Sequence, residues 1–115
     1  YFKNVFPFRE YKRLRFMWVE PGGYILPHRD NDQRTLSPVN VSIYNPRDCE
    51  FRYKNWGTVP FSNGSAFLID VGQQHAVWNK SQEARLHIIC HGRRKNPEWK
   101  QLLLKSWQKF GYGKY

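Results

Sequence analysis

Two stretches of this chain contain side chains that bind transition-metal ions. His28 and Asp30 are separated by one residue, so an extended backbone would point both side chains the same way. His75 follows much later, directly after the turn residues 72–74. Two imidazoles and one carboxylate can hold one face of a metal ion and leave the other positions open, which suits a non-haem Fe(II) centre that binds a co-substrate and oxygen. A turn capped by Asp30 is the alternative interpretation of the first pair.

Further polar residues could complete such a site. Arg85 lies in a strand-like segment, where its planar guanidinium could bind a carboxylate through two hydrogen bonds or form a surface ion pair with Glu83. Strand alternation places His87 on the same face as Arg85. His87 is therefore a candidate to contact a ligand or to replace His75 on the metal, with a hydrogen-bonded core histidine as the alternative. His91 is expected in a surface loop.

The order of these residues resembles that of the 2-oxoglutarate and Fe(II)-dependent dioxygenases, specifically the aspartyl/asparaginyl β-hydroxylase-like branch. Residues 21–30 provide the glycine-containing segment that leads into the H-x-D motif, and residues 75–81 provide an H-x-V-W-N-x-S run. Asp70 is the acid that precedes the second histidine, and Arg85 follows that histidine by ten positions. The resemblance extends over residues 14–91.

The resemblance implies both a site and an activity. The metal ligands of Fe(II) would be His28, Asp30 and His75. The co-substrates would be 2-oxoglutarate, which chelates the metal, and O2. Arg85 would bind the distal carboxylate of 2-oxoglutarate, and Asn40 and His87 would be further contacts of this co-substrate. The implied reaction couples oxidative decarboxylation of 2-oxoglutarate to hydroxylation of an amino-acid side chain, free or in a peptide.

The branch also has a second cofactor-binding arginine, for which this chain offers no clear match. Pro38 lies near its place, and Arg34 is the candidate to substitute from the preceding loop. The sequence therefore leaves open both the second carboxylate contact of 2-oxoglutarate and the identity of the amino acid that is hydroxylated.

Short strands must position these residues, because the middle of the chain alternates between apolar and polar residues and is broken by turn residues. Strands are expected at 14–20, 24–26, 39–44, 49–56, 66–71, 75–78 and 84–90. Asn63-Gly64 is a strong signal for a hairpin turn. Asn96 and Pro97 are typical of a helix start, and apolar residues then share one face, namely Trp99, Leu102, Leu103, Trp107 and Phe110.

The predicted fold is an all-β core, a double-stranded β-helix (jelly roll, cupin-like), with a C-terminal α-helix packed on the outside. The 115 residues, 40% of them hydrophobic, are expected to form a single domain. Its parts would be an N-terminal arm at 1–13, the core at 14–92 and the helix at 96–111. No apolar run approaches the roughly 20 residues of a membrane span, which favours a cytoplasmic protein without a membrane partner.

The formal net charge is +10, and the excess of basic residues lies at the two ends of the chain. Basic flanks can bind nucleic acid, so a nucleic-acid-binding domain is one alternative function. A cupin-like module that binds a metal or a small molecule without oxygenase turnover is another. The principal interpretation is an enzyme whose partner is a small-molecule or peptide substrate. The sequence does not determine its oligomeric state.

Overall fold

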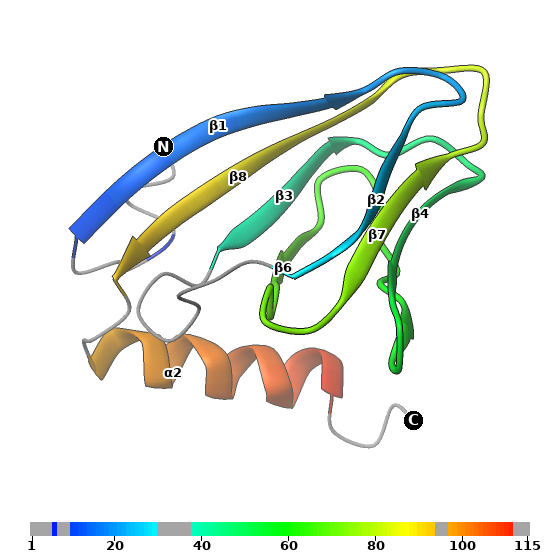
Figure 1. Ribbon diagram of the computed structural model, residues 1–115. Coiled ribbons are helices and arrows are strands. Elements are labelled where there is room, and N and C mark those ends of the chain that lie inside the picture. The colour runs from blue at the N-terminus through cyan, green and yellow to red at the C-terminus, as the bar shows by residue number, and fades with distance from the viewer. Residues whose placement is uncertain (1–5, 7–9, 30–37, 94–96, 112–115) are drawn as a thin grey trace.

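The computed structural model describes residues 6, 10–29, 38–93 and 97–111 (Figure 1). Within them the strands are β1 (Glu10–Val19), β2 (Tyr24–His28), β3 (Val39–Tyr44), β4 (Cys49–Tyr53), β5 (Gly57–Thr58), β6 (Ala66–Leu68), β7 (His75–Asn79) and β8 (Arg85–Arg93). They are followed by helix α2 (Pro97–Ser106) and a π-helical turn, η1 (Trp107–Gly111).

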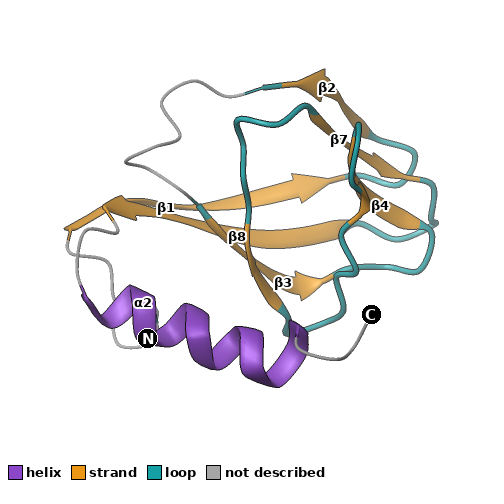
Figure 2. Ribbon diagram, turned by 90° about the horizontal axis from the view of Figure 1, so that it is seen from below, coloured by secondary structure: helices purple, strands orange, loops and turns teal. Residues whose placement is uncertain are grey.

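The strands form two antiparallel sheets that face one another (Figures 1 and 2). The strand order is β1-β8-β3-β6 in one sheet, here called the β8 sheet, and β2-β7-β4-β5 in the other, here called the β7 sheet. Sequential strands alternate between the sheets several times, as expected for a jelly roll. The prediction of an all-β jelly-roll core with an outer C-terminal helix is confirmed.

Glycines carry the chain from β1 in one sheet to β2 in the other. Gly22 has a φ of 76°, which an L residue adopts only at a cost. A Cβ atom on Gly23 would lie 2.9 Å from the carbonyl oxygen of Glu20, so a larger residue there would require the turn to move. These two glycines allow β2 to start directly across from the end of β1.

Asn79 ties this crossover to the neighbouring one between β7 and β8. Its fully buried Nδ2 donates to the carbonyl oxygens of Val19 (3.0 Å), Glu20 (3.2 Å) and Glu83 (2.7 Å). Its Oδ1 accepts hydrogen bonds from the Ser81 backbone N–H (3.1 Å) and hydroxyl (2.6 Å). The asparagine and serine of the H-x-V-W-N-x-S run therefore close one end of the space between the sheets.

Two apolar clusters stabilise the fold. The first lies between the sheets and is built from Val19, Cys49, Phe51, Tyr53, Ile69 and Val77. The second lies on the outer face of the β8 sheet, where Trp99 of α2 packs against Val39 and Cys90. The helix thus covers the outer face of the β8 sheet. The inner face of that sheet is free to contact the first cluster, between the sheets.

The ladder between β1 and β8 is longer than predicted. β1 begins at Glu10, inside the predicted arm, and β8 continues to Arg93 instead of ending at residue 90. The register pairs Glu10 with Arg93 and Val19 with Arg85. Local sequence signals missed these ends because basic residues weaken the apolar pattern there. The two ends are nevertheless strands, because β1 and β8 pair with each other along their full length.

Asn63-Gly64 forms a turn but not a hairpin. Gly64 has a φ of 82°, as the motif predicts. However, β5 before it pairs with β4, and β6 after it pairs with β3 in the other sheet. The hairpin prediction is wrong because an Asn-Gly pair specifies a chain reversal, while the partner of each strand is chosen by packing across the whole sheet.

The apolar face of the helix is narrower than predicted. Trp99 is buried and Leu102 packs beside it, but Leu103 is 39% exposed and Trp107 is 58% exposed. The predicted cap, Asn96, lies outside the described residues. Among the helical segments of the described ranges, none has the length and apolar content needed to span a membrane.

Candidate active site

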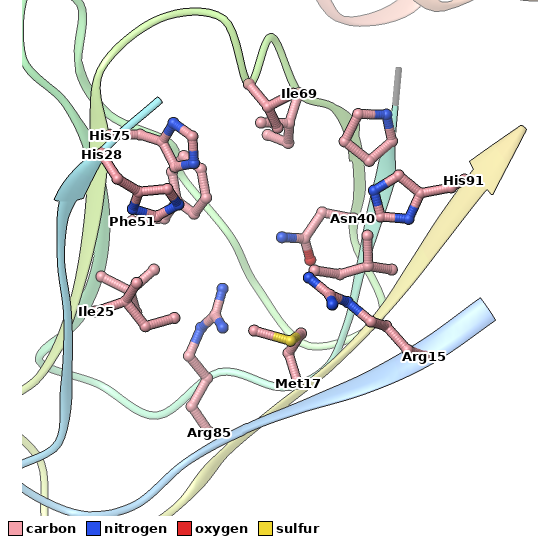
Figure 3. Close-up of a pocket in the computed structure, with 14 residues that line it drawn as sticks. Arg15, Met17, Ile25, His28, Asn40, Phe51, Ile69, His75, Arg85 and His91 are labelled. Carbon is pink, nitrogen blue, oxygen red and sulfur yellow. The ribbon is translucent and has the colours of Figure 1, made fainter. Parts of the chain in front are cut away.

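The two histidines predicted to ligate a metal lie side by side. β2 and β7 pair so that His28 is opposite His75, and their ring centroids are 4.4 Å apart at an angle of 57°. Figure 3 shows both rings on one wall of a cavity of about 100 Å³ between the sheets. Residues far apart in the sequence are thus brought together by the register of two strands.

Backbone carbonyl groups fix the tautomer of both rings. Nδ1 of His28 lies 2.8 Å from the carbonyl oxygen of Leu26, and Nδ1 of His75 lies 2.7 Å from that of Gln73. A carbonyl oxygen can only accept, so the proton of each neutral ring is on Nδ1. The lone pair is then on Nε2, the tautomer that a metal-ligating histidine uses when its other nitrogen is held by a backbone oxygen.

Aromatic neighbours and the preceding turn hold His75 in place. Its ring stacks on Phe51 with centroids 5.3 Å apart and an angle of 8°, and only 5% of the residue is exposed. Asp70, the acid that precedes this histidine, accepts a hydrogen bond from the N–H of Gly72 at 3.0 Å. Its own N–H donates to the hydroxyl of Tyr53 at 2.9 Å. Asp70 thus shapes the turn that presents His75.

Arg85 points into the same cavity from the start of β8 (Figure 3). It is 1% exposed, and its Nη2 lies 3.1 Å from Nδ1 of His87. Its Nε has no hydrogen-bond partner, and no carboxylate forms an ion pair with it in the described part of the chain. Burial lowers the pKa of Arg85 to about 10, which still leaves the guanidinium charged at neutral pH. A buried cation without a counter-ion is costly, and an anionic ligand would offset that cost.

The surface ion pair with Glu83 is not formed, because Arg85 is interior and the Glu83 carboxylate instead contacts the hydroxyl of Tyr44.

His87 lies behind Arg85 and does not line the cavity. It is fully buried, its Nδ1 lies 2.6 Å from the amide oxygen of Asn40, and its Nε2 lies 3.0 Å from that of Asn45. Burial, together with the smaller effect of the nearby Arg85 charge, lowers the pKa of His87 to about 3. The ring is therefore neutral at physiological pH. Its observed contacts are those of a hydrogen-bonded core histidine that supports Arg85.

Asn40 joins this network to the cavity. It lies on β3, is 4% exposed, and lines the cavity while its side chain contacts His87. The predicted ligands Asp30 and Arg34 lie outside the described residues. Within the described ranges, no three potential ligands among His, Cys, Asp and Glu come together as a metal site. The structure thus brings together His28, His75, Arg85 and Asn40.

Two cavity residues were missed by the sequence analysis. His91 was predicted in a surface loop, but it belongs to β8 and lines the cavity. Strand alternation from Arg85 already placed it on the inner face, and the signal was lost because the strand was ended too early. Arg15 of β1 also lines the cavity. It looked like one of several basic flank residues, although alternation with Met17 and Val19 would have indicated a shared face.

Comparisons with known proteins concern the family and the fold. The sequence model of the family described as "Aspartyl/Asparaginyl beta-hydroxylase" matches residues 4–95. Among solved structures, a Cupin 2 conserved barrel domain protein from Salinispora arenicola is similar in fold, with a TM-score of 0.52. The two chains are 14% identical over 81% of this chain and 70% of the other. No curated protein matches the sequence.

The family match covers most of the chain and includes both histidines and the buried arginine. The structural likeness supports the barrel fold independently of sequence identity. The chain belongs to the aspartyl/asparaginyl β-hydroxylase family.

Proposed function

We propose that this protein is a non-haem Fe(II) and 2-oxoglutarate-dependent dioxygenase that hydroxylates an amino-acid side chain, free or within a peptide. His28, His75 and Asp30 would hold the iron. The metal, when bound, would supply the activation of O2 and the oxidative decarboxylation of 2-oxoglutarate. The observation that carries the proposal is the buried Arg85 in the same cavity as the histidine pair, with no carboxylate partner among the residues that the structure describes.

The donor chemistry of the cavity fits both groups. Two imidazoles with their lone pairs on Nε2 leave room for a carboxylate and for exchangeable ligands, as a facial Fe(II) site requires. A zinc site would prefer to be closed by four protein ligands, or by three and one water. Arg85 is suited to an anionic co-substrate because its guanidinium presents parallel donors to a carboxylate.

The roles of the chain's own residues follow from these positions. Arg85 would orient 2-oxoglutarate by its distal carboxylate, and His87 would hold Arg85 in place through the contact between its Nδ1 and Nη2 of Arg85. Asn40 would offer an amide to the bound co-substrate, and a buried amide requires such partners. Apolar neighbours such as Ile25 and Val77 would keep bulk water away from the reacting atoms.

Succinate formation from 2-oxoglutarate tests the proposal without a known substrate, because enzymes of this type consume the co-substrate slowly on their own. The purified protein with Fe(II), O2 and 2-oxoglutarate should release succinate, with faster release when the correct amino acid or peptide is added. His28→Ala and His75→Ala should abolish the reaction while the circular-dichroism spectrum is unchanged.

Three results would count against the proposal. Metal binding without any 2-oxoglutarate consumption, and with unchanged ligand affinity in Arg85→Ala, would indicate a binding module of the cupin type. Full consumption of 2-oxoglutarate by His75→Ala would show that the ligand set is wrong. Salt-sensitive binding of nucleic acid that survives loss of both histidines would favour the third function that the basic flanks suggest.

A further inference from the structure

Asn45 has no part in the proposed function, yet it stands at the end of the hydrogen-bond network behind Arg85. It follows β3 in the turn that leads to β4, and it does not line the cavity. Its Oδ1 lies 3.0 Å from Nε2 of His87, and Nδ1 of the same ring lies 3.1 Å from Nη2 of Arg85. A chain of contacts thus links this turn to the guanidinium in the cavity.

A single proton has to serve both nitrogens of the His87 ring. The ring is neutral at physiological pH, because burial lowers its pKa to about 3, so one nitrogen bears a proton and the other a lone pair. A guanidinium can only donate hydrogen bonds, so Nδ1 can bond to Arg85 only through its lone pair. The proton is then on Nε2, where it points to the amide oxygen of Asn45.

The amide of Asn45 is oriented as this arrangement requires. Its Nδ2 donates to the carbonyl oxygen of Cys49 at 3.4 Å, which leaves Oδ1 on the side of His87. A turned amide would place its oxygen against that carbonyl oxygen instead. The backbone N–H of Asn45 also donates to Oδ1 of Asn63 at 2.8 Å, so the turn that carries the amide is anchored.

Asn40 is the third partner of the ring, and its amide adapts to the other two. Its Oδ1 lies 2.6 Å from Nδ1 of His87, a contact that a proton on Nδ1 would favour. That proton would oppose the N–H of Arg85, donor against donor, and would leave Nε2 and the Asn45 oxygen as two acceptors facing each other. A half-turn of the Asn40 amide exchanges its oxygen and nitrogen without changing its shape, so that Asn40 donates to the same lone pair.

The direction of these bonds determines what Arg85 presents to the cavity. With Nη2 held by His87, the guanidinium plane is fixed, and Nε, which has no partner among the described residues, remains for a ligand. A His87 ring that was held at Nδ1 alone could rotate and let the guanidinium turn with it. The bond to Asn45 opposes this rotation, because it holds the ring at the other nitrogen.

We propose that Asn45 is a positioning residue for the co-substrate: it holds His87 with the ring proton on Nε2, and His87 in turn holds Arg85. This inference rests on the proposed function, because it takes the ligand of Arg85 to be 2-oxoglutarate. Asn45 acts through two other residues and not by contact with the ligand.

The position of the ring proton can be measured on the wild-type protein without any ligand. In proton–nitrogen correlation spectra of the isotope-labelled protein, protonated and unprotonated ring nitrogens resonate far apart, and Nε2 couples to both carbon-bound ring protons. The His87→Gln variant identifies the signals by their loss. We expect the proton on Nε2. A proton on Nδ1 would overturn the proposal.

Two nearly isosteric variants test the effect on the co-substrate. Asn45→Leu removes the acceptor for the ring proton, whereas Asn45→Asp keeps it. Affinity is measured by titrating 2-oxoglutarate into the Fe(II) protein without oxygen, in mildly alkaline buffer that keeps His87 neutral. Asn45→Leu should bind 2-oxoglutarate about tenfold more weakly, the effect of one lost hydrogen bond, and Asn45→Asp should bind it nearly as well as the wild-type protein. Unchanged affinity in Asn45→Leu would overturn the proposal.

Asn63→Ala is the matched control for a purely structural effect. It removes the hydrogen bond to the backbone N–H of Asn45 and loosens the same turn, but it leaves the contact with the ring of His87 in place. It should lower the free energy of unfolding in urea and leave both the His87 signals and the affinity for 2-oxoglutarate unchanged. An equal loss of affinity in Asn63→Ala and Asn45→Leu would show that Asn45 only shapes the turn, which would overturn the proposal.

The two measurements separate this inference from the proposed function. A wild-type protein that binds 2-oxoglutarate but has the ring proton on Nδ1 would keep the proposed function and overturn the role of Asn45. A wild-type protein that has the proton on Nε2 but binds no 2-oxoglutarate would overturn the proposed function, together with the positioning role that depends on it. The hydrogen bond from His87 to Asn45 would still stand in that case.

Discussion

Arg85 brings a positive charge into the interior of a small barrel, where nothing in the described residues neutralises it. Such a group lowers the stability of the protein without a ligand. The Arg85→Met variant should therefore raise the free energy of unfolding by about 1–4 kcal/mol in the absence of ligand, the range seen when buried charges are replaced by apolar groups. It should also remove any stabilisation by 2-oxoglutarate. Urea denaturation with and without 2-oxoglutarate measures both effects.

Arg52 provides the control for this prediction. It is an exposed arginine whose Nη2 lies 3.8 Å from the Glu50 carboxylate, so Arg52→Met should change stability by less than about 1 kcal/mol. If Arg85→Met were instead strongly destabilised without ligand, the charge of Arg85 would already be compensated and the argument for an anionic ligand would fail.

His87 makes stability depend on pH in a defined window. Burial and Arg85 lower the pKa of His87 to about 3 in the folded protein, while the unfolded chain has the ordinary value of 6.5. Between these values the unfolded state binds a proton that the folded state does not, so the stability contribution is present above pH 6.5 and is lost as pH falls toward 3. The slope is up to about 1.4 kcal/mol per pH unit.

The corresponding measurement is the free energy of unfolding at several pH values between about 4 and 6.5, which lie between the pKa values of His87 in the folded and the unfolded protein. His87→Gln should show a smaller slope than the wild-type protein, because glutamine does not titrate. Identical slopes in the two proteins would mean that the pKa of His87 is not lowered in the folded protein, which would contradict its burial beside Arg85.

At the scale of elements, Asn79 holds two crossovers together at the closed end of the barrel. Asn79→Ala would remove the buried donor to the Val19 carbonyl and the amide oxygen that accepts from the Ser81 N–H, and each group left unpaired costs about 1–3 kcal/mol. The carbonyl groups of Glu20 and Glu83 keep hydrogen bonds from the Gly23 N–H and the Ser81 hydroxyl. We expect a loss of at least about 2 kcal/mol in the free energy of unfolding. Ser81→Ala, which removes a half-buried hydroxyl from the same motif, should cost about 1 kcal/mol. If Asn79→Ala and Ser81→Ala lowered the free energy of unfolding equally in denaturant experiments, Asn79 would not be the residue that holds the two crossovers together.

Prediction of the elements from sequence succeeded where local signals decide and failed where distant partners do. The period-two pattern at Val39–Tyr44 gave that strand with its observed bounds. By contrast, the extension of β1 to Glu10 and the pairing of β6 with β3 depend on long-range hydrogen bonds that no local pattern encodes. The predicted strand ended at residue 90 whereas β8 continues to Arg93, which explains why His91 was assigned to a loop.

At the scale of the whole molecule, the outer apolar cluster, which stabilises the fold, lies apart from the cavity that holds the candidate site. Trp99 packs on the outside of the β8 sheet, away from the cavity between the sheets. Trp99→Ala should lower the free energy of unfolding by about 3–5 kcal/mol, as for other buried tryptophans. Binding of 2-oxoglutarate by the folded protein should be unchanged. Leu104→Ala, at a residue 56% exposed on the same helix, should have little effect on either quantity. A large change in affinity for Trp99→Ala would contradict this division.

The sequence could predict much of the site because its residues stand in a fixed order along the chain. His28, His75 and Arg85 were each identified from motif spacing, and the strand register then brought them to one cavity. The sequence could not show that Arg85 is interior and meets no carboxylate among the described residues. This depends on how the two sheets pack, and it carries the co-substrate proposal.

The central claim is that the histidine pair and Arg85 together bind Fe(II) and 2-oxoglutarate. Anaerobic addition of both to the purified protein tests it through the weak visible charge-transfer band of the iron chelate. We expect this band in the wild-type protein and in Arg47→Gln, which changes an exposed arginine in a turn away from the cavity, and its loss in His75→Ala and in Arg85→Gln. A wild-type protein without the band, or a His75→Ala variant that retains it, would contradict the account.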